Sequence, residues 1–444
     1  LTDSDVRHTD HNAVAMRFGL GGGWGFHLFP KTEPQGFLKR VKVLRNNLYD
    51  IGHRPAPGEA CHAIEVRGGE LVEIAHNVVD RTYASGIQAI NNRFNGSQEE
   101  IPLNRILVHH NKVTNTLREA NDWGGIASWG FGPSYVYNNI SANAVGHRHS
   151  CYRQGRPGPD VDSFRRLTWT NLGPTFYFDH MHKGYCFNNI GWGTNNDIED
   201  PYYSTVGYFE CVGSMNHVFH NTFHRLATGM LTLNPRGCYL GNLCLDIGDS
   251  FITSTASTAH SSTTAYASNV FQGDVEHFAL GGGQSRYSQL ADWRNHLSKN
   301  DALASGTGSV TERPSVRDAA GHDFRPAENA SGSDRGVKVF VPWGLYKVVG
   351  EWQFHENRAD PTQIVDEHVL LNWEVSSPRT LSRLPHVDLV GENVSAEDYE
   401  TGLLEDWVHG ALRFNGDDQY CHLADAVANG SEAVKSSLPA RGER

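Results

Sequence analysis

The chain has 444 residues, enough for two or three ordinary domains or for one long repetitive domain with an extension. Its 46 glycines, its 10% of aromatic residues and its four methionines are typical of a β-rich protein with many tight turns, which argues against a helical bundle. The formal net charge is −12 and no Lys/Arg run exceeds two residues, so nucleic acid is excluded as an expected partner.

Cysteine usage and hydropathy narrow the class further. The seven cysteines lack CxxC spacing, so we interpret them as small core residues, not as a disulfide framework or a zinc ribbon. No apolar run reaches the roughly 20 residues of a membrane span, so no membrane-spanning segment is expected. The chain begins at Leu1 without a signal peptide, and we interpret it as a processed or excised piece.

One short pattern recurs through the first part of the chain: alternating apolar residues, an asparagine, and then a branched or large apolar residue. Successive copies lie 21 to 50 residues apart, which fits β-solenoid coils of roughly 20–30 residues with variable loops. Asparagine suits such turns because it tolerates a left-handed backbone and its amide can bond to identical neighbours. The asparagines are Asn47, Asn77, Asn111, Asn139, Asn189, Asn221, Asn242 and Asn269.

A second predicted strand precedes most of these asparagine strands, and its side chains should alternate between two faces. The apolar residues that we align as one inward column are Ile64, Ile87, Ile126, Phe178, Phe209 and Leu231. The residues that follow them, predicted to point outward, are Glu65, Gln88, Ala127, Asp179, Glu210 and Thr232. The pattern predicts an all-β chain built on a right-handed parallel β-helix. An antiparallel sandwich is disfavoured because it would need hairpin signals every 8–12 residues.

Three segments follow from this pattern in chain order. Residues 1–275 are predicted to form the β-helix and to carry the active site, with an insertion at 143–174 over one face. Residues 276–360 should close the helix end and contain a short packing helix at 288–298. Residues 361–444 are predicted to be a linker and a partial β segment, in which 411–425 resembles the opening strands of laminin-G or concanavalin-like jelly rolls.

Two outward carboxylates are the candidate catalytic pair. If Asp179 and Glu210 occupy one column on adjacent coils, about 4.8 Å apart, their carboxyl groups have the separation that retaining glycosidases use. Because two negative charges so close repel each other, one carboxyl group is expected to stay ionised while the other keeps its proton. Asp122, just before the strand of the preceding coil, is the third candidate catalytic residue.

The residues around this pair are candidates for substrate binding. Trp123 and Trp129 offer faces on which sugar rings can stack, and Gly124 and Gly125 allow the backbone to come close to a ligand. The remaining candidates are His180, His182, Lys183 and Arg153. We predict no metal site: the histidines beside the asparagine turns, His76, His110 and His220, are interpreted as turn and stacking residues.

These motifs carry a family resemblance. REANDWGGIASWGFGPSYVYNNIS, then FYFDHMHKGYCFNNIGWG and GYFECVGSMNHVFHNTF, resemble bacterial right-handed β-helix proteins of the pectate-lyase-like superfamily, especially β-helix glycoside hydrolases of the β-xylosidase type. The resemblance spans roughly residues 40–270. It implies that an aspartate and a glutamate on adjacent coils act as nucleophile and acid/base, which carries over to Asp179 and Glu210. Within that span the Asp-Asp and Gly-His-Gly signatures of polygalacturonases are absent.

We therefore predict a retaining glycoside hydrolase that acts on a plant or algal polysaccharide or its oligosaccharides. It should be a secreted or periplasmic monomer that needs no cofactor, the location being inferred from the substrate class alone. Two alternatives stay open. One is a polysaccharide lyase that uses Ca²⁺ and a base from Lys183 or an arginine of residues 153–166. The other is a non-catalytic carbohydrate-binding or adhesin module.

Overall fold

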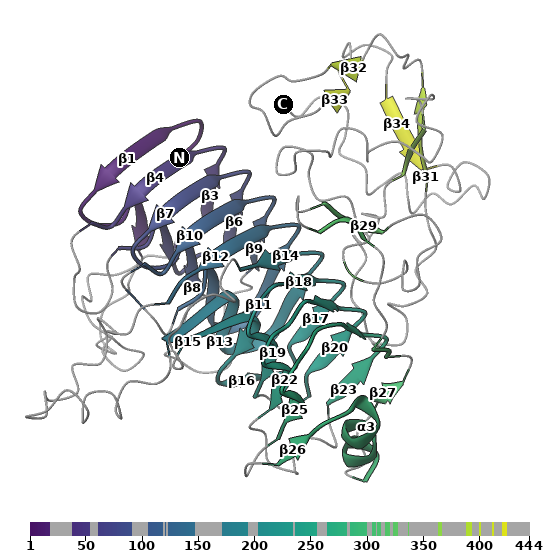
Figure 1. Ribbon diagram of the computed structural model, residues 1–444. Coiled ribbons are helices and arrows are strands. Elements are labelled where there is room, and N and C mark those ends of the chain that lie inside the picture. Colours follow the sequence, from purple (N-terminus) through teal and green to yellow (C-terminus); the bar gives the residue numbers. More distant parts are fainter. Residues whose placement is uncertain are drawn as a thin grey trace, which may run out of the picture. The chain divides into compact units, whose positions relative to one another are not determined.

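The computed structural model divides the chain into two compact units, Leu1–Val337 and Lys338–Arg444 (Figure 1). The structure describes residues 1–17, 38–53, 61–90, 105–118, 120, 123–146, 171–193, 203–233, 236–254, 264–281, 285–299, 304–307, 309–311, 316–319, 323–326 and 336 of the first unit, and 363–365, 388–392, 399–400, 411–412 and 420–423 of the second. Strands dominate these residues, and most of their pairings are parallel. The protein is therefore all-β, as predicted.

The first unit contains three ladders of parallel strands. The first ladder is β1 (Asp5–Thr9), β4 (Asn47–Ile51), β7 (Val78–Thr82), β10 (Lys112–Thr116), β12 (Ile140–Ala144), β14 (Ile190–Trp192), β18 (Thr222–His224), β21 (Leu243–Leu245) and β24 (Val270–Phe271). The second is β2 (Val14–Arg17), β5 (Ile64–Arg67), β8 (Ile87–Ile90), β11 (Ile126–Tyr137), β13 (Asn171–Phe187), β15 (Tyr203–Glu210), β19 (Thr228–Thr232), β22 (Ser250–Ser254) and β25 (His277–Leu280). The third is β3 (Arg40–Leu44), β6 (Leu71–Ala75), β9 (Arg105–His109), β11, β13, β17 (His217–Phe219), β20 (Cys238–Leu240), β23 (Ala265–Ala267) and β27 (Ala304–Thr307).

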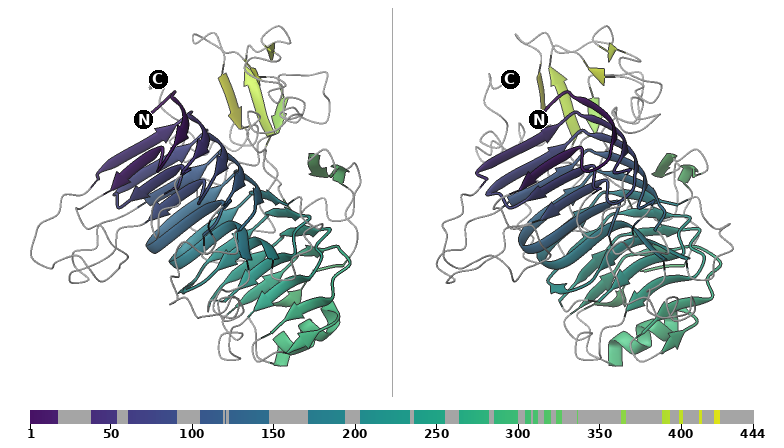
Figure 2. Two further views of the ribbon diagram at one scale, coloured as in Figure 1. Left: turned by 60° about the vertical axis from the view of Figure 1, so that its left-hand side comes forward. Right: turned by 90° about the vertical axis from the view of Figure 1, so that its left-hand side faces the viewer.

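The chain visits the three ladders in rotation, so most strands pair with the strand three places earlier. The long strands β11 and β13 serve the second and third ladders at once, and β16 (Gly213–Ser214) pairs with the middle of β13. We call each passage through the ladders a rung. Figure 1 shows the strands stacked in chain order, and the two views of Figure 2 show the same parallel ranks from other directions.

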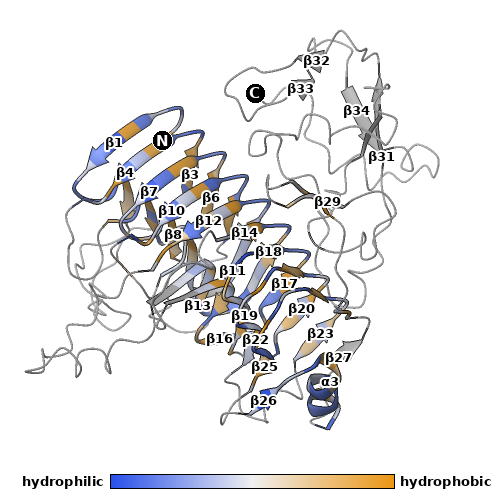
Figure 3. Ribbon diagram, viewed as in Figure 1, coloured by the Kyte–Doolittle hydropathy of each residue, from blue (hydrophilic) through white to orange (hydrophobic). Residues whose placement is uncertain are grey.

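A continuous apolar core lies between the ladders. One set of alternating strand residues from each ladder lines it, while hydrophilic residues colour the turns and helix α3 (Leu290–Lys299) (Figure 3). In the second ladder the pairing registers place Ile64, Ile87, Ile126, Phe176, Tyr208 and Met230 in one inward column. The first three agree with the predicted inward column. Phe178 also faces the core but lies two residues further along its strand, whereas Phe209 and Leu231 face outward.

The predicted asparagine repeat is confirmed as a buried ladder of side chains. It consists of Asn46, Asn77, Asn111, Asn139, Asn189, Asn221, Asn242 and Asn269, and it ends on Ser309. Each backbone N–H donates to the side chain on the next rung. From Asn77 onward, each amide nitrogen also donates to a strand carbonyl of the previous rung, as Asn189 does to Val136. In the first rung the prediction is wrong by one residue, because Asn46 is the ladder member and Asn47 is exposed.

A left-handed residue precedes every member of this asparagine ladder. These residues are Arg45, His76, His110, Asn138, Asn188, His220, Gly241 and Ser268, with φ between 51° and 60°. The conformation turns the chain sharply from the third ladder into the first, and asparagine and glycine adopt it at low cost. The interpretation of His76, His110 and His220 as turn residues is confirmed.

Helix α3 and the cysteines also match expectation. Trp293 and Leu297 of α3 are buried, as their helical spacing predicted. Cys186, Cys238 and Cys244 are buried free thiols, and Cys61 is buried as well. Within the ranges that the structure describes, no helix has the length and apolar character needed to cross a membrane.

The described parts of the second unit are short antiparallel strands. β31 (Asp388–Glu392) pairs with β30 (Gln363–Val365) and β34 (Tyr420–Leu423), and β32 (Tyr399–Glu400) pairs with β33 (Ala411–Leu412). In the first unit, β26 (Arg286–Tyr287) pairs antiparallel with β25, and β28 (Val316–Asp318) pairs antiparallel with β29 (Asp323–Pro326). The jelly-roll resemblance of residues 411–425 stays a prediction.

Candidate functional site

Asp179 lies on the outward face of the second ladder. The strand registers align it with Trp129 of β11, and Trp129 with Ile90 and Arg67 of the two preceding rungs. We call these four residues the Asp179 column. Neighbouring members are separated by one strand spacing, about 4.8 Å, so Trp129 is the direct neighbour of the Asp179 carboxyl group on that side.

The Asp179 carboxyl group is almost enclosed, with 8% of the residue exposed. The backbone N–H of Val212 donates to Oδ1 over 3.5 Å, the thiol of Cys211 hydrogen-bonds the carboxylate, and Nε2 of His180 lies 3.8 Å from Oδ1. Burial raises the pKa of Asp179 above its usual range, although His180 and these hydrogen bonds oppose the shift. A carboxyl group whose proton is held more firmly than usual can act as a general acid.

Glu210 faces the interior, so the prediction that it shares one outward column with Asp179 is wrong. Its partner in register is Phe178, a core residue, and not Asp179. The side chain is fully buried and its carboxylate accepts hydrogen bonds from four donors. They are Tyr208 Oη at 3.0 Å, Asn216 Nδ2 at 3.2 Å, Leu233 N at 3.0 Å and Tyr239 Oη.

The hydroxyl groups that hold Glu210 are themselves locked in the protonated form. Burial, followed by the charge of Glu210, raises the pKa values of Tyr208 and Tyr239 well above the usual value. Both hydroxyl groups therefore remain donors. Four donors around one buried carboxylate make Glu210 a structural residue that joins neighbouring rungs.

The error has a local cause in the sequence around these strands. Residues 176–178 read Phe-Tyr-Phe and both faces of β13 are covered, so hydrophobic alternation does not distinguish the inward side from the outward side. The prediction aligned Phe209 and Leu231 as inward residues, but they pack with Tyr177 in a separate outward cluster. A slip of one residue reverses every side chain of a strand.

The tryptophans pack against each other next to Asp179. The rings of Trp123 and Trp129 are stacked with centroids 4.8 Å apart and planes 14° apart, and His62 meets Trp123 edge-on at 5.1 Å. Trp123 is buried and Trp129 is partly exposed. Of these two predicted stacking residues, Trp129 is therefore the one that is partly accessible, while Trp123 supports it from behind.

The paired glycines predicted to admit a ligand serve strand packing. A Cβ atom on Gly124 would lie 2.6 Å from Cβ of Tyr177, and one on Gly125 would lie 2.4 Å from Oγ of Ser141. The space beside both glycines is filled by neighbouring rungs. Glycine is therefore required at these positions by packing between rungs, and not by the approach of a ligand to the backbone.

The predicted residues after Asp179 line the corner where β13 passes from the second to the third ladder. His180 and Lys183 have left-handed φ values of 49° and 58°, and Lys183 is exposed. His182 Nδ1 lies 2.7 Å from Oγ of Ser214, and burial, with a smaller effect of His180, lowers the pKa of His182. His180 is the member of this group that reaches the Asp179 carboxylate. Asp122 and Arg153 lie outside the described residues.

Two further polar groups lie on the same outward face. Gln88 is completely buried, and neither atom of its amide group has a hydrogen-bond partner. One rung away, the carboxylate of Glu65 accepts from Asn12 Nδ2 at 2.5 Å and from Arg67, a member of the Asp179 column. Burial of the Gln88 amide without a partner costs roughly 1–3 kcal/mol. The sequence pointed to Gln88 and Glu65 only as outward residues.

Elsewhere, the described part of the chain holds two clusters whose donor atoms are close enough to bind a metal ion. One combines His76, His109 and His110, and the other combines His8, Asp50 and His53. Neither cluster was predicted, because each assembles from different rungs.

The fold and site define an all-β protein with parallel strand ladders, an inward asparagine ladder and an outward acidic residue beside stacked tryptophans. In comparisons with known proteins, no protein-family model, no curated protein and no solved structure matches the chain significantly.

Proposed function

We propose that the three ladders of the first unit form a right-handed parallel β-helix. The rotation of the chain through the ladders supports this proposal, as do the parallel registers and the asparagine ladder, which bonds equivalent turns to one another. We propose the right hand because connections between parallel strands of one sheet are almost always right-handed. Such a stack presents long outward columns of side chains, a geometry suited to an extended polymer.

We further propose that the protein is a glycoside hydrolase acting on a polysaccharide or its oligosaccharides, in which Asp179 is the general acid. One observation carries this proposal: a nearly enclosed carboxyl group with a raised pKa lies beside the partly exposed ring of Trp129. Trp129 would hold a sugar ring by stacking, and Asp179 would protonate the leaving glycosidic oxygen.

Glycosidases generally pair such an acid with a second carboxylate. Glu210 is not that group, because its carboxylate is enclosed by four donors in the core. Asp122, one residue before Trp123 in the sequence, stays the third predicted catalytic residue. The proposed substrate class implies a secreted or periplasmic protein.

The proposal is tested by incubating the chain with a panel of plant and algal polysaccharides and measuring released reducing ends. Asp179→Asn should lower kcat by about 100-fold or more, the usual contribution of a general acid. Asp80→Asn is the matched control, because Asp80 accepts hydrogen bonds from Thr114 and Asn115 on the first ladder. It should retain wild-type kcat.

Other outcomes separate the alternatives. Full turnover by Asp179→Asn would contradict the proposed role of this residue. A product that absorbs ultraviolet light, formed only without chelator, would identify a Ca²⁺-dependent lyase instead. Binding of polysaccharide without any release of reducing ends would identify a non-catalytic module.

A further inference from the structure

Three histidines meet where the third ladder turns into the first. His76 and His110 hold the same left-handed position on neighbouring rungs, with φ of 58° and 59°, and their ring centroids are 4.9 Å apart. His109 is the last residue of β9, and its Nδ1 lies 2.7 Å from Nδ1 of His110. Donor nitrogens of the three rings all lie within 4.8 Å of one another. We call these residues the three-histidine cluster.

The ring of His109 is held in place from two sides. It stacks on Tyr137 with centroids 4.9 Å apart, and its Nε2 lies 3.6 Å from Oε1 of Glu73. Glu73 is itself fixed by Lys42, whose Nζ is 3.0 Å from Oε2. A carboxylate behind a histidine orients the ring and keeps the proton on the nitrogen that faces it. The lone pair of His109 is then on Nδ1, the atom that faces the other two rings.

We propose that the three-histidine cluster binds one divalent transition-metal ion of the Zn²⁺ class, with Glu73 as the carboxylate partner of His109. Imidazole nitrogen is a preferred ligand of such ions, and three protein ligands leave a fourth position for water or a ligand atom. With metal–nitrogen bonds of about 2.0–2.1 Å, tetrahedral ligand atoms stand about 3.3 Å apart. The nitrogens of His109 and His110 are 2.7 Å apart and need to separate by about 0.6 Å, and His76 is exposed.

Neighbouring charges permit a cation at this position. Arg45 holds the equivalent turn position one rung before His76, but its guanidinium group is bound to both carboxylate oxygens of Asp3 at 2.7 and 2.8 Å. That ion pair reduces its repulsion of a bound metal, and the nearby cation Lys42 is likewise paired, with Glu73.

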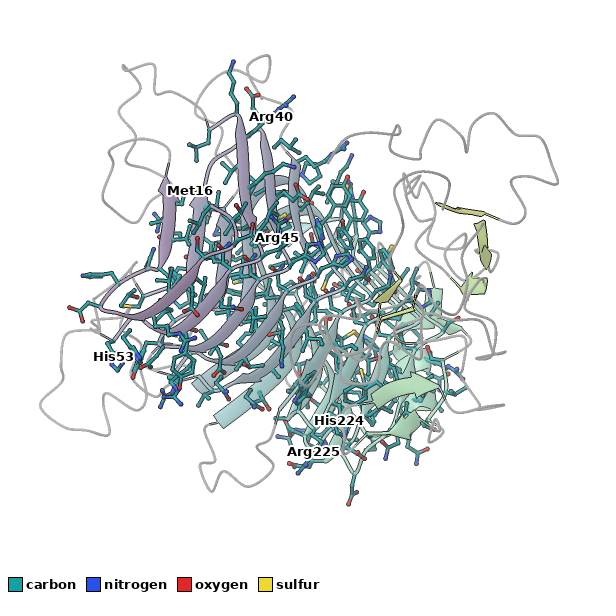
Figure 4. The ribbon with its side chains drawn as sticks, turned by 90° about the horizontal axis from the view of Figure 1, so that it is seen from above. Met16, Arg40, Arg45, His53, His224 and Arg225 are labelled. Carbon is teal, nitrogen blue, oxygen red and sulfur yellow. The ribbon has the colours of Figure 1, made fainter. Side chains whose placement is uncertain are left out.

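The second cluster is the natural control. Asp50 Oδ2 lies 3.0 Å from His8 Nδ1 and 2.8 Å from His53 Nε2, so the carboxylate already binds both rings without an ion. Both rings are largely exposed. Arg45 holds the same turn position as His76 and His110, and His53 belongs to the second cluster. Figure 4 shows Arg45 and His53 at separate places on the first unit.

The experiment titrates the full chain, freed of metal with chelator, with Zn²⁺ alone in a calorimeter, and repeats the titration with Co²⁺ to read its coordination by absorption. His76→Asn/His110→Asn removes two ligands and keeps the turn, because Asn138 and Asn188 hold the same position on later rungs. His8→Asn/His53→Asn is the matched control. His109→Phe removes the third ligand while keeping an aromatic ring on Tyr137.

We expect the wild type and the His8→Asn/His53→Asn control to bind one more equivalent of Zn²⁺ than His76→Asn/His110→Asn and His109→Phe do. Glu73→Gln should weaken this site about 10- to 100-fold, the usual effect of losing a carboxylate partner. Circular dichroism verifies that each variant is folded, and if the double variant is not, His109→Phe decides. Equal Zn²⁺ binding by wild type and folded cluster variants, no binding by the wild type, or loss only in the control would each overturn the proposal.

Discussion

The asparagine ladder and the Asp179 column are both aligned along the strand stack, but they satisfy their polar groups in different ways. In the ladder, every rung contributes the same side chain and the same hydrogen bonds, so one turn predicts the next. In the Asp179 column, every rung contributes a different residue, and the register with β13 is interrupted directly after Trp129. The repeated asparagine turn thus aligns the rungs with one another. The residue type varies from rung to rung on the outward strand face that carries the Asp179 column.

The largest effect is expected from breaking the ladder in its middle. Asn189→Leu removes the buried acceptor of the Asn139 backbone N–H and amide, and the donor to the carbonyl of Val136. Each buried group left unpaired costs roughly 1–3 kcal/mol, so we expect the free energy of unfolding to fall by at least about 3 kcal/mol. Urea unfolding followed by fluorescence measures the loss.

Asn47→Leu is the control for this prediction, because Asn47 is the neighbour that the sequence pattern selected and the structure leaves exposed. Its unfolding free energy should change by less than about 0.5 kcal/mol. Equal losses in Asn47→Leu and Asn189→Leu would show that the hydrogen bonds of the ladder do not stabilise the stack.

A smaller effect is expected from crowding the rung that carries Trp129. A Cβ atom on Gly125 would meet Oγ of Ser141 at 2.4 Å and the carbonyl oxygen of Thr175 at 3.2 Å. Gly125→Ala should therefore lower the free energy of unfolding by about 1–3 kcal/mol, as overpacking usually does. A variant as stable as the wild type would indicate that the space beside Gly125 is open, as a ligand-facing glycine requires.

The smallest effect is a pH dependence from Asp179. Burial raises its pKa above 3.8, so the folded protein holds this proton more firmly than the unfolded chain does. The stability contributed by the group is present below the ordinary aspartate pKa and is lost as the pH rises through the raised value. Urea unfolding between about pH 4 and 8 should show Asp179→Asn gaining stability relative to the wild type as the pH rises. A variant that loses stability relative to the wild type as the pH rises would contradict this.

The parts of the fold that the sequence predicted are those where one residue type has one physical role. The ladder asparagines were found from Asn77 to Asn269 because each amide makes the same bonds on its own rung. Ile64 and Ile87 were placed correctly because polar residues alternate with them. In the first rung, two consecutive asparagines satisfied the same pattern, and only the structure separates Asn46 from Asn47.

The candidate site was predicted in part. The prediction failed where it assigned Glu210 to the wrong face of its strand. Asp179, Trp129 and His180 do lie together, whereas Glu210 points to the other side of its strand. Aromatic residues fill both faces of these strands, so no alternation marks the inward side. The three-histidine cluster was missed although a signal exists: His76 and His110 both precede a ladder asparagine, which places them on adjacent rungs.

The central claim is that Asp179 and Glu210, predicted as a pair, face opposite sides of the strand ladder. The unfolding free energies of Asp179→Asn and Glu210→Gln, measured side by side at neutral pH, test it most directly. We predict a loss of about 1–3 kcal/mol for Glu210→Gln, whose four donors lose a charged acceptor, and no loss for Asp179→Asn. A stable Glu210→Gln variant beside a destabilised Asp179→Asn variant would contradict this assignment of faces.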